Sequence, residues 1–109
     1  MFRKILSFVR GCFAPIYRIS RVEEKPERMN NRTVYVIGED DTSWAAVFLC
    51  PCGCRAEVWL NLLEHENRPT WTVQEVKGEK VHITPSVWSK TGCKSHFFIK
   101  QGRLIWAGK

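Results

Sequence analysis

The chain has 109 residues, a length typical of one domain, and a formal net charge of +6. Residues 1–28 carry seven Lys or Arg against three Glu, whereas the remainder carries ten against eight acidic residues. Because a nucleic-acid-binding domain needs a basic stripe on its folded face, this distribution argues against that class. No segment approaches the length of apolar sequence that crosses a bilayer, which argues against a membrane-spanning protein.

The first 19 residues predict an amphipathic basic helix or tail. Apolar residues recur there at helical spacing until Pro15 ends the pattern. The residues of this face are Phe2, Ile5, Leu6, Val9 and Phe13. Such a helix packs on its own domain, docks a partner or lies on a membrane surface. Residues 20–32 are polar and aperiodic, so we predict a linker there.

The folded body is predicted to span residues 33–109. Alternating and β-branched segments indicate strands, and polar or glycine-containing segments between them indicate turns. The expected strands are 33–38, 43–49, 56–62, 71–76, 80–84, 96–100 and 103–106. We predict a mainly β fold: a small antiparallel, zinc-stabilised domain built from hairpins, with the amino-terminal helix attached. Residues 85–88 are interpreted as a tight turn or a single helical turn, with Ser86 as a turn residue.

Two cysteine clusters in this body predict a metal site. Three cysteines fall within residues 50–54, and Cys93 lies in a Gly-Cys-Lys-Ser-His segment ending at His96. Tetrahedral zinc accepts sulfur and imidazole ligands from such short turns, whereas a Cys-x-Cys disulfide closes a strained ring. The favoured Zn²⁺ ligands are Cys50, Cys52, Cys54 and Cys93, with His96 as an alternative ligand. A closed set of four ligands is structural, so it would tie two hairpins together.

The number and position of the cysteines also bear on the compartment. The chain has five, and Cys12 stands apart from both clusters, where a free thiol is expected. An oxidised secreted scaffold usually pairs all of its cysteines. Because Arg10 interrupts the first apolar run early, no signal peptide is expected either. The reducing cytoplasm is therefore the predicted location.

Candidate catalytic residues lie beside the second cluster. Ser95 and His96 are the nearest nucleophile and base, although adjacent strand residues point to opposite faces. Ser95 has an alternative interpretation as a turn hydroxyl that bonds the backbone. In a site with a metal-bound water, Glu57 is a candidate general base. His65 and His82 are further candidate bases without a supporting motif.

Six short motifs together resemble a small bacterial protein family. They are Cys-Pro-Cys-Gly-Cys at 50–54, Leu-Asn-Leu-Leu at 60–63, Arg-Pro-x-Trp at 68–71, Pro-Ser-Val-Trp at 85–88, Gly-Cys-x-Ser-His-Phe at 92–97 and Gly-x-x-x-Trp at 102–106. Members of that family are often encoded beside bacterial ubiquitin-like proteins and their conjugation enzymes, some in antiphage loci. The resemblance implies a zinc-bearing accessory protein of such a pathway, with a peptidase that trims or removes the modifier as the implied activity. By position it implies Cys50, Cys52, Cys54 and Cys93 for metal, and Ser95 and His96 for chemistry.

Three functional hypotheses follow from these observations. The first is a small peptidase, with Ser95 and His96 or a metal-bound water near the zinc. A second is a non-catalytic, zinc-stabilised module that binds a ubiquitin-like protein or a conjugation enzyme through exposed aromatic residues such as Trp59. The third, a nucleic-acid binder, is disfavoured because basic residues are not interleaved with aromatic residues along one strand.

Overall fold

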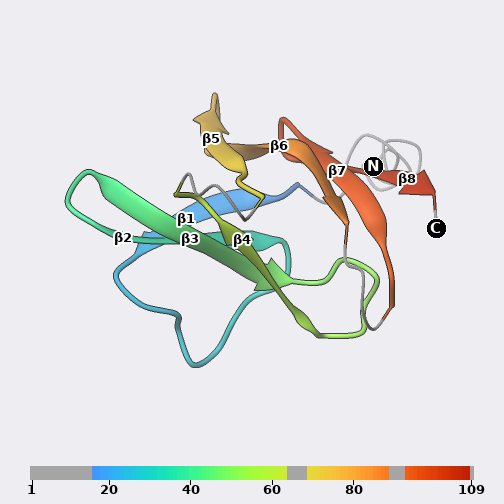
Figure 1. The fold of residues 1–109 in the computed structure, drawn as a ribbon, viewed down its shortest axis with the longest axis horizontal. Helices are drawn as coiled ribbons and strands as arrows, with labels where there is room; N and C mark the ends of the chain where they lie inside the picture. The colour runs from blue at the N-terminus through green and yellow to red at the C-terminus, as the bar shows by residue number, and fades with distance from the viewer. Residues whose placement is uncertain (1–15, 64–68, 89–92, 109) are drawn as a thin grey trace, which may run out of the picture.

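The computed structural model describes residues 16–63, 69–88 and 93–108, and these form eight strands joined in one sheet. The strands, shown in Figure 1, are β1 (Arg18–Val22), β2 (Thr33–Glu39), β3 (Thr42–Leu49), β4 (Glu57–Asn61), β5 (Thr72–Val76), β6 (Lys80–Trp88), β7 (His96–Lys100) and β8 (Arg103–Gly108). Their order in the sheet is β4-β3-β2-β1-β6-β7-β8, and β5 pairs with β6 outside this path. None of the described residues forms a helix that is long and apolar enough to cross a membrane.

The chain is mainly β, as predicted, but the predicted fold class was wrong in two respects. Strand β1 pairs in parallel with β2, so the sheet is mixed and not purely antiparallel. No helix occurs in the described part of the chain, whereas an amino-terminal helix was predicted; residues 18 and 19, the end of the predicted helix or tail segment 1–19, begin β1. The periodic stretch at residues 2–13 lies outside the described residues. Strand β1 spans the predicted boundary at residues 19 and 20, between the helix or tail segment and the linker. The sheet therefore includes residues that precede Thr33, where we expected the folded body to begin.

Tyr17 and β1 join two groups of strands, β2–β4 and β5–β8. The Tyr17 amide donates to the Gly102 carbonyl at 2.7 Å, and the Val81 amide donates to the Tyr17 carbonyl at 3.2 Å. On the other side, β1 is in register with β2 along its whole length, from Arg18 opposite Thr33 to Val22 opposite Ile37. The segment thus supplies the backbone link that a purely hairpin-built domain would lack.

The main core lies between these two groups of strands. Aromatic edges meet there: the ring centroids of Phe48 on β3 and Phe97 on β7 are 6.1 Å apart, and Tyr17 lies 6.4 Å from Phe48. Alternation along the strands supplies most of the remaining core residues, because every second side chain faces inward. These are Val34, Val36, Ala46, Cys50, Val58, Leu60, Val81, Ile83, Val87 and Ile99.

A second, smaller apolar cluster covers the opposite face of β2 and β3. Tyr35, Ile37 and Val47 are buried there, with Val22 and Met29 packed against them. The Asn30 amide also donates to the Tyr35 hydroxyl oxygen at 2.9 Å. Part of the segment that we expected to be a polar linker therefore packs on the sheet.

Candidate functional site

The four cysteines predicted as metal ligands come together in space. Their Sγ atoms all lie within 4.8 Å of one another, with Cys50 Sγ 3.5 Å from Cys52 Sγ and 3.4 Å from Cys93 Sγ. Four thiolates around tetrahedral zinc, with bonds of about 2.3 Å, stand about 3.8 Å apart, so a modest adjustment of the exposed thiols fits the ion. The cluster could therefore hold a metal ion, and an all-sulfur donor set suits zinc.

Backbone geometry explains why three cysteines converge. The turn after β3 is closed by the Cys50 amide, which donates to the Ala56 carbonyl at 2.8 Å, and by the Gly53 amide, which donates to the Cys50 carbonyl at 3.2 Å. Gly53 adopts a φ of 92°, a left-handed value that glycine reaches without a steric penalty. Cys93 reaches this turn from the segment just before β7, so the cluster joins the tip of the β3–β4 hairpin to the start of β7.

The thiols of the cluster have contrasting acidities. Burial raises the pKa of Cys50 to about 12, whereas hydrogen bonding, first of all to Ser95, lowers the pKa of Cys93 to about 6. Ser95 is itself buried, and its Oγ lies 3.1 Å from Cys93 Sγ. A hydroxyl that donates to a ligand thiolate is a common partner of a metal site because it orients the sulfur and stabilises its charge.

His96 forms a hydrogen bond with a different serine from the one that we predicted. Its Nε2 lies 2.9 Å from the Oγ of Ser86 on the neighbouring strand, whereas Ser95 contacts the thiol cluster. The structure therefore does not bring the Ser95 and His96 side chains together, and it leaves the imidazole outside the four-thiol set. A serine hydroxyl within 2.6–3.2 Å of an imidazole nitrogen is the arrangement that activates a nucleophile.

A register shift in β6 positions Ser86. Between the pairs Ile83–Ile99 and Val87–Phe97, β6 has three residues and β7 only one, so β6 bulges there. A bulge of this kind re-aims side chains, and here it places Ser86 and Trp88 on the face opposite the buried Val87. Residues 85–88, expected to form a separate turn, thus continue the strand. The Trp71 indole Nε1 donates to the Ser86 carbonyl at 3.1 Å and anchors the backbone at this point.

Aromatic rings hold the imidazole in place. The Trp88 ring stacks on His96 with centroids 5.1 Å apart and an interplanar angle of 18°, and Phe98 lies at 6.1 Å. Among residues 16–63, 69–88 and 93–108, no carboxylate hydrogen-bonds to His96. The indole face thus contacts the imidazole where a serine–histidine–aspartate triad has a carboxylate, and an indole in this position can stabilise an imidazolium by cation–π attraction.

For a catalytic Ser86–His96 pair, Trp88 would act as a positioning residue. Trp88→Ala should then lower kcat by about tenfold with a smaller change in KM, because the imidazole loses its support. Trp88→Phe should restore most of kcat, since a smaller ring still stacks. Steady-state kinetics on the two variants checks this, and equal losses of kcat in both would contradict a stacking role.

The other candidate residues are engaged elsewhere. The Glu57 carboxylate accepts from Lys25 Nζ at 2.8 Å and from Trp59 Nε1 at 3.1 Å, and these bonds lower the pKa of Glu57. His82 Nδ1 accepts from the Gln101 amide at 3.1 Å. His65 lies outside the described residues. Trp59 is 50% exposed on the face of β4 opposite the core, as the alternation of that strand predicted.

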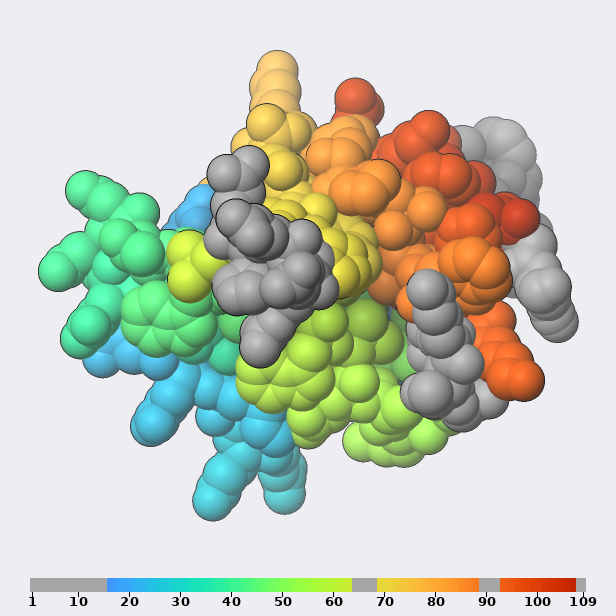
Figure 2. All heavy atoms as spheres, viewed as in Figure 1, coloured from blue at the N-terminus to red at the C-terminus, as the bar shows by residue number. Residues whose placement is uncertain are grey.

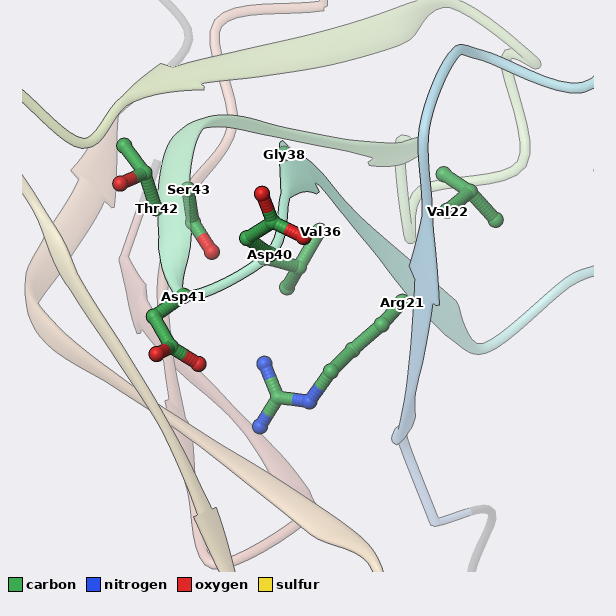
Figure 3. Close-up of a pocket in the computed structure, with 8 residues that line it drawn as sticks. All are labelled: Arg21, Val22, Val36, Gly38, Asp40, Asp41, Thr42 and Ser43. Atoms are coloured by element: carbon green, nitrogen blue, oxygen red, sulfur yellow. The ribbon is translucent and has the colours of Figure 1, made fainter.

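A cavity of about 260 Å³ lies away from this site, between β1 and the β2–β3 turn. Figure 3 shows the Arg21 and Asp41 side chains pointing into the same space. Its lining residues are Arg21, Val22, Val36, Gly38, Asp40, Asp41, Thr42 and Ser43. Because this set contains no histidine or cysteine, it offers no counterpart to the Ser86–His96 pair.

The fold and the site together define a class: a small β protein in which a serine–histidine pair lies on the strands next to a four-cysteine cluster that could hold a metal ion. Residues 21–107 match the model of a family described as bacterial ubiquitination-like system serine protease (BubE). The chain therefore belongs to the BubE family. Comparison with curated proteins and with solved structures finds no match.

Membership of this family supports the resemblance found in the sequence, in that the family belongs to a bacterial ubiquitination-like system. The match begins at residue 21, within β1, whereas we expected the family resemblance to begin near residue 33.

Proposed function

We propose that this protein is a zinc-bearing serine peptidase of a bacterial ubiquitin-like conjugation pathway, acting in the cytoplasm on the ubiquitin-like modifier. The observation that carries the proposal is the 2.9 Å contact between Ser86 Oγ and His96 Nε2. The description of the family as a serine protease supports it independently. Ser86 replaces Ser95 as the proposed nucleophile, and His96 keeps its proposed role as general base.

The pair supports a two-step acyl transfer. Ser86 Oγ attacks the carbonyl carbon of the scissile amide while His96 Nε2 takes the hydroxyl proton. The imidazolium then gives that proton to the leaving amine, so the C–N bond breaks and an ester on Ser86 remains. A water molecule, deprotonated by the same imidazole, hydrolyses the ester and frees Ser86. Both peptide and isopeptide bonds are amides, so this chemistry suits trimming of a modifier and its removal from a target.

The four thiols are proposed to hold zinc in a structural site. A closed tetrahedral set gives the ion a stabilising role without an open position for substrate. Within the chain, Cys93 and Ser95 then fix the start of β7, three residues and one residue before His96.

Covalent labelling tests the assignment of the nucleophile. We expect a fluorophosphonate to form a Ser86 Oγ–P bond with loss of fluoride, because His96 activates this hydroxyl. Peptide mass spectrometry should find the adduct on Ser86 in the wild-type protein and in Ser95→Ala. The adduct should be absent from Ser86→Ala and much slower to form in His96→Ala. Labelling of Ser95 instead would overturn the assignment.

One observation favours a second function, a non-catalytic module that binds a protein of the same pathway. Trp59, half exposed on β4, offers an aromatic contact surface on the face opposite the core. In that case the fluorophosphonate would label no serine, and Trp59→Ala would abolish the binding of the modifier or its conjugation enzyme.

A further inference from the structure

The net charge of the chain comes entirely from its last part. Residues 80–109 contain six basic residues and no acidic residue. They are Lys80, Lys90, Lys94, Lys100, Arg103 and Lys109. The preceding 79 residues contain the other 11 basic residues and all 11 acidic ones, so they are neutral in sum. This asymmetry is not apparent when the charges are counted on either side of residue 28, as above, because acidic residues are in excess in the middle of the chain.

The basic part of the chain is also the part that carries the Ser86–His96 pair. It forms β6, β7 and β8, which appear in orange to red on one side of the molecule in Figure 2. Lys100 and Arg103 are exposed and opposite each other where β7 turns into β8, and Lys94 is exposed near the thiol cluster. None of these three forms an ion pair with a described residue. Their charges therefore remain available to a partner.

An apolar surface connects these charges to the catalytic pair. His96, Phe98 and Lys100 alternate along one face of β7, and Ile105 of β8 lies opposite Phe98 on the same face. Ile105 is 43% exposed, and Lys100 Nζ lies 4.8 Å from the centre of the Phe98 ring. We call the surface formed by His96, Phe98, Lys100, Arg103 and Ile105 the β7–β8 outer face. Its residues follow one another along β7 and across to β8, from the imidazole to the two basic side chains.

We infer that the β7–β8 outer face binds an acidic segment of the polypeptide substrate, next to the bond that Ser86 attacks. This inference rests on the proposed peptidase function, and it names the chemistry of the substrate. Carboxylates of the segment would meet Lys100 and Arg103, and an apolar side chain would lie on Phe98 and Ile105. Such charge complementarity mainly speeds encounter and selects among partners, which suits an enzyme that must find one substrate in a crowded cell.

A nucleic acid fits the same face less well. Bases bind single-strand-binding proteins by stacking on open aromatic rings. On this face the His96 ring already stacks with Trp88. The face is also continuous with a serine–histidine pair, whose chemistry acts on acyl groups.

Cleavage-site profiling with the full, zinc-loaded chain tests the inference. The probe is a library of peptides from a tryptic digest of a bacterial proteome, with cleaved products identified by mass spectrometry. We expect Asp and Glu to be enriched within about five residues on one side of the cleaved bonds, a span that a strand the length of β7 covers. The best peptide is then compared with its twin in which Asn and Gln replace Asp and Glu.

Charge reversal identifies the surface responsible. In the double variant Lys100→Glu and Arg103→Glu, kcat/KM for the acidic peptide should fall about tenfold, the combined effect of two exposed ion pairs. For the amide twin it should change less than about twofold, which shows that the catalytic pair is intact. Lys77→Glu, an exposed reversal at the β5–β6 turn, is the matched control and should leave both rates unchanged. Added salt should also weaken the preference for the acidic peptide.

Each contrary result has a distinct meaning. Cleavage without acidic enrichment, or equal losses in the double variant and in Lys77→Glu, would overturn the inference and leave the peptidase function standing. If single-stranded DNA inhibits cleavage more strongly than the acidic peptide does, and the double variant relieves this, the face binds nucleic acid and the inference is wrong. If the wild-type protein cleaves no peptide and no modifier, the proposed function fails first and the inference fails with it.

Discussion

Ser86→Ala is expected to lower kcat/KM for cleavage of the ubiquitin-like modifier by at least about 1,000-fold, with the protein still folded. The reason is that the hydroxyl is the attacking atom, and without it only substrate binding and the surrounding polar groups remain to accelerate hydrolysis. His96→Ala should cause a loss of the same order, because an unactivated serine is a poor nucleophile at neutral pH. Intact-mass measurement of the modifier over time gives these rates.

A variant that combines Ser86→Ala with His96→Ala tests more directly whether the two side chains act together. Residues that act as one unit are strongly non-additive, so Ser86→Ala combined with His96→Ala should be no slower than the worse single variant. If the fold-losses of kcat/KM in the two single variants multiply in the combined variant, the two side chains act separately, which would contradict a Ser86–His96 pair that acts as one unit. Thermal melting of each variant separates lost chemistry from lost structure.

Ser95→Ala is the matched control for this experiment. Ser95 lies nine residues from Ser86 in the sequence and contacts Cys93, so its removal should weaken metal affinity by about 10- to 100-fold. With zinc in excess, the rate of cleavage should stay within about threefold of wild type. If Ser95→Ala instead abolishes cleavage and Ser86→Ala does not, the nucleophile is Ser95, as the sequence first indicated.

The four-cysteine cluster could be predicted from the sequence because its determinants are local. Three cysteines in five residues form their own turn, and the Gly-Cys-x-Ser-His spacing provides a second short turn that needs only to meet the first. Most hairpins could also be predicted from the sequence, because apolar and polar residues alternate along their strands and their turns carry glycine or acidic residues. For example, β7 and β8 were expected at 96–100 and 103–106, and the structure has them at His96–Lys100 and Arg103–Gly108.

The Ser86–His96 pair, which we propose to be catalytic, was not predicted from the sequence because it depends on the register of two strands. Ser86 and His96 belong to different strands, and only the bulge in β6 brings their side chains to one position on one face. Pro85 made the segment look like the end of a strand, since proline lacks the amide that a central strand needs. The alternation of polar Ser86, buried Val87 and exposed Trp88 was the signal that the strand continues.

Strand β1 was missed for a related reason. Its partner β2 runs parallel to it, so no tight turn marks the pair in the sequence. Its residues, Arg-Ile-Ser-Arg-Val, are only partly apolar, because this strand is only partly buried. A linker was predicted at residues 20–32 because they are polar and aperiodic, whereas in the structure residues 20–22 pair with β2.

Removal of the zinc ion that we propose for the four-cysteine cluster is expected to cost this domain most of its stability. Structural zinc sites bind with roughly 10–16 kcal/mol of apparent free energy in zinc-finger peptides, which is as large as the 5–15 kcal/mol that holds a typical domain folded. Here the cluster joins the β3–β4 tip to the start of β7, a link that the strand pairing does not supply directly. A chelator that strips the metal should therefore lower Tm by more than about 15 °C or abolish cooperative unfolding.

Cys50→Ser should reproduce this effect more fully than Cys54→Ser. The Cys50 thiol is buried in the main core and lies close to both Cys52 and Cys93, whereas Cys54 is exposed at the end of the turn. Serine at position 50 removes a ligand and also buries a hydroxyl among apolar side chains, which adds a desolvation cost. Cys12→Ser, which changes the cysteine outside both clusters, is the control and should leave metal content and Tm unchanged.

Metal content, measured together with Tm and cleavage, decides whether the cluster supports the catalytic pair. Because Cys93 precedes His96 by three residues, loss of the metal releases the start of β7 and with it the imidazole that faces Ser86. We therefore expect cleavage to disappear with the metal and to return when zinc is restored to reduced protein. Metal-free, reduced protein that keeps both its Tm and its activity would show that the four thiols hold no stabilising ion, and that the Ser86–His96 pair does not depend on them.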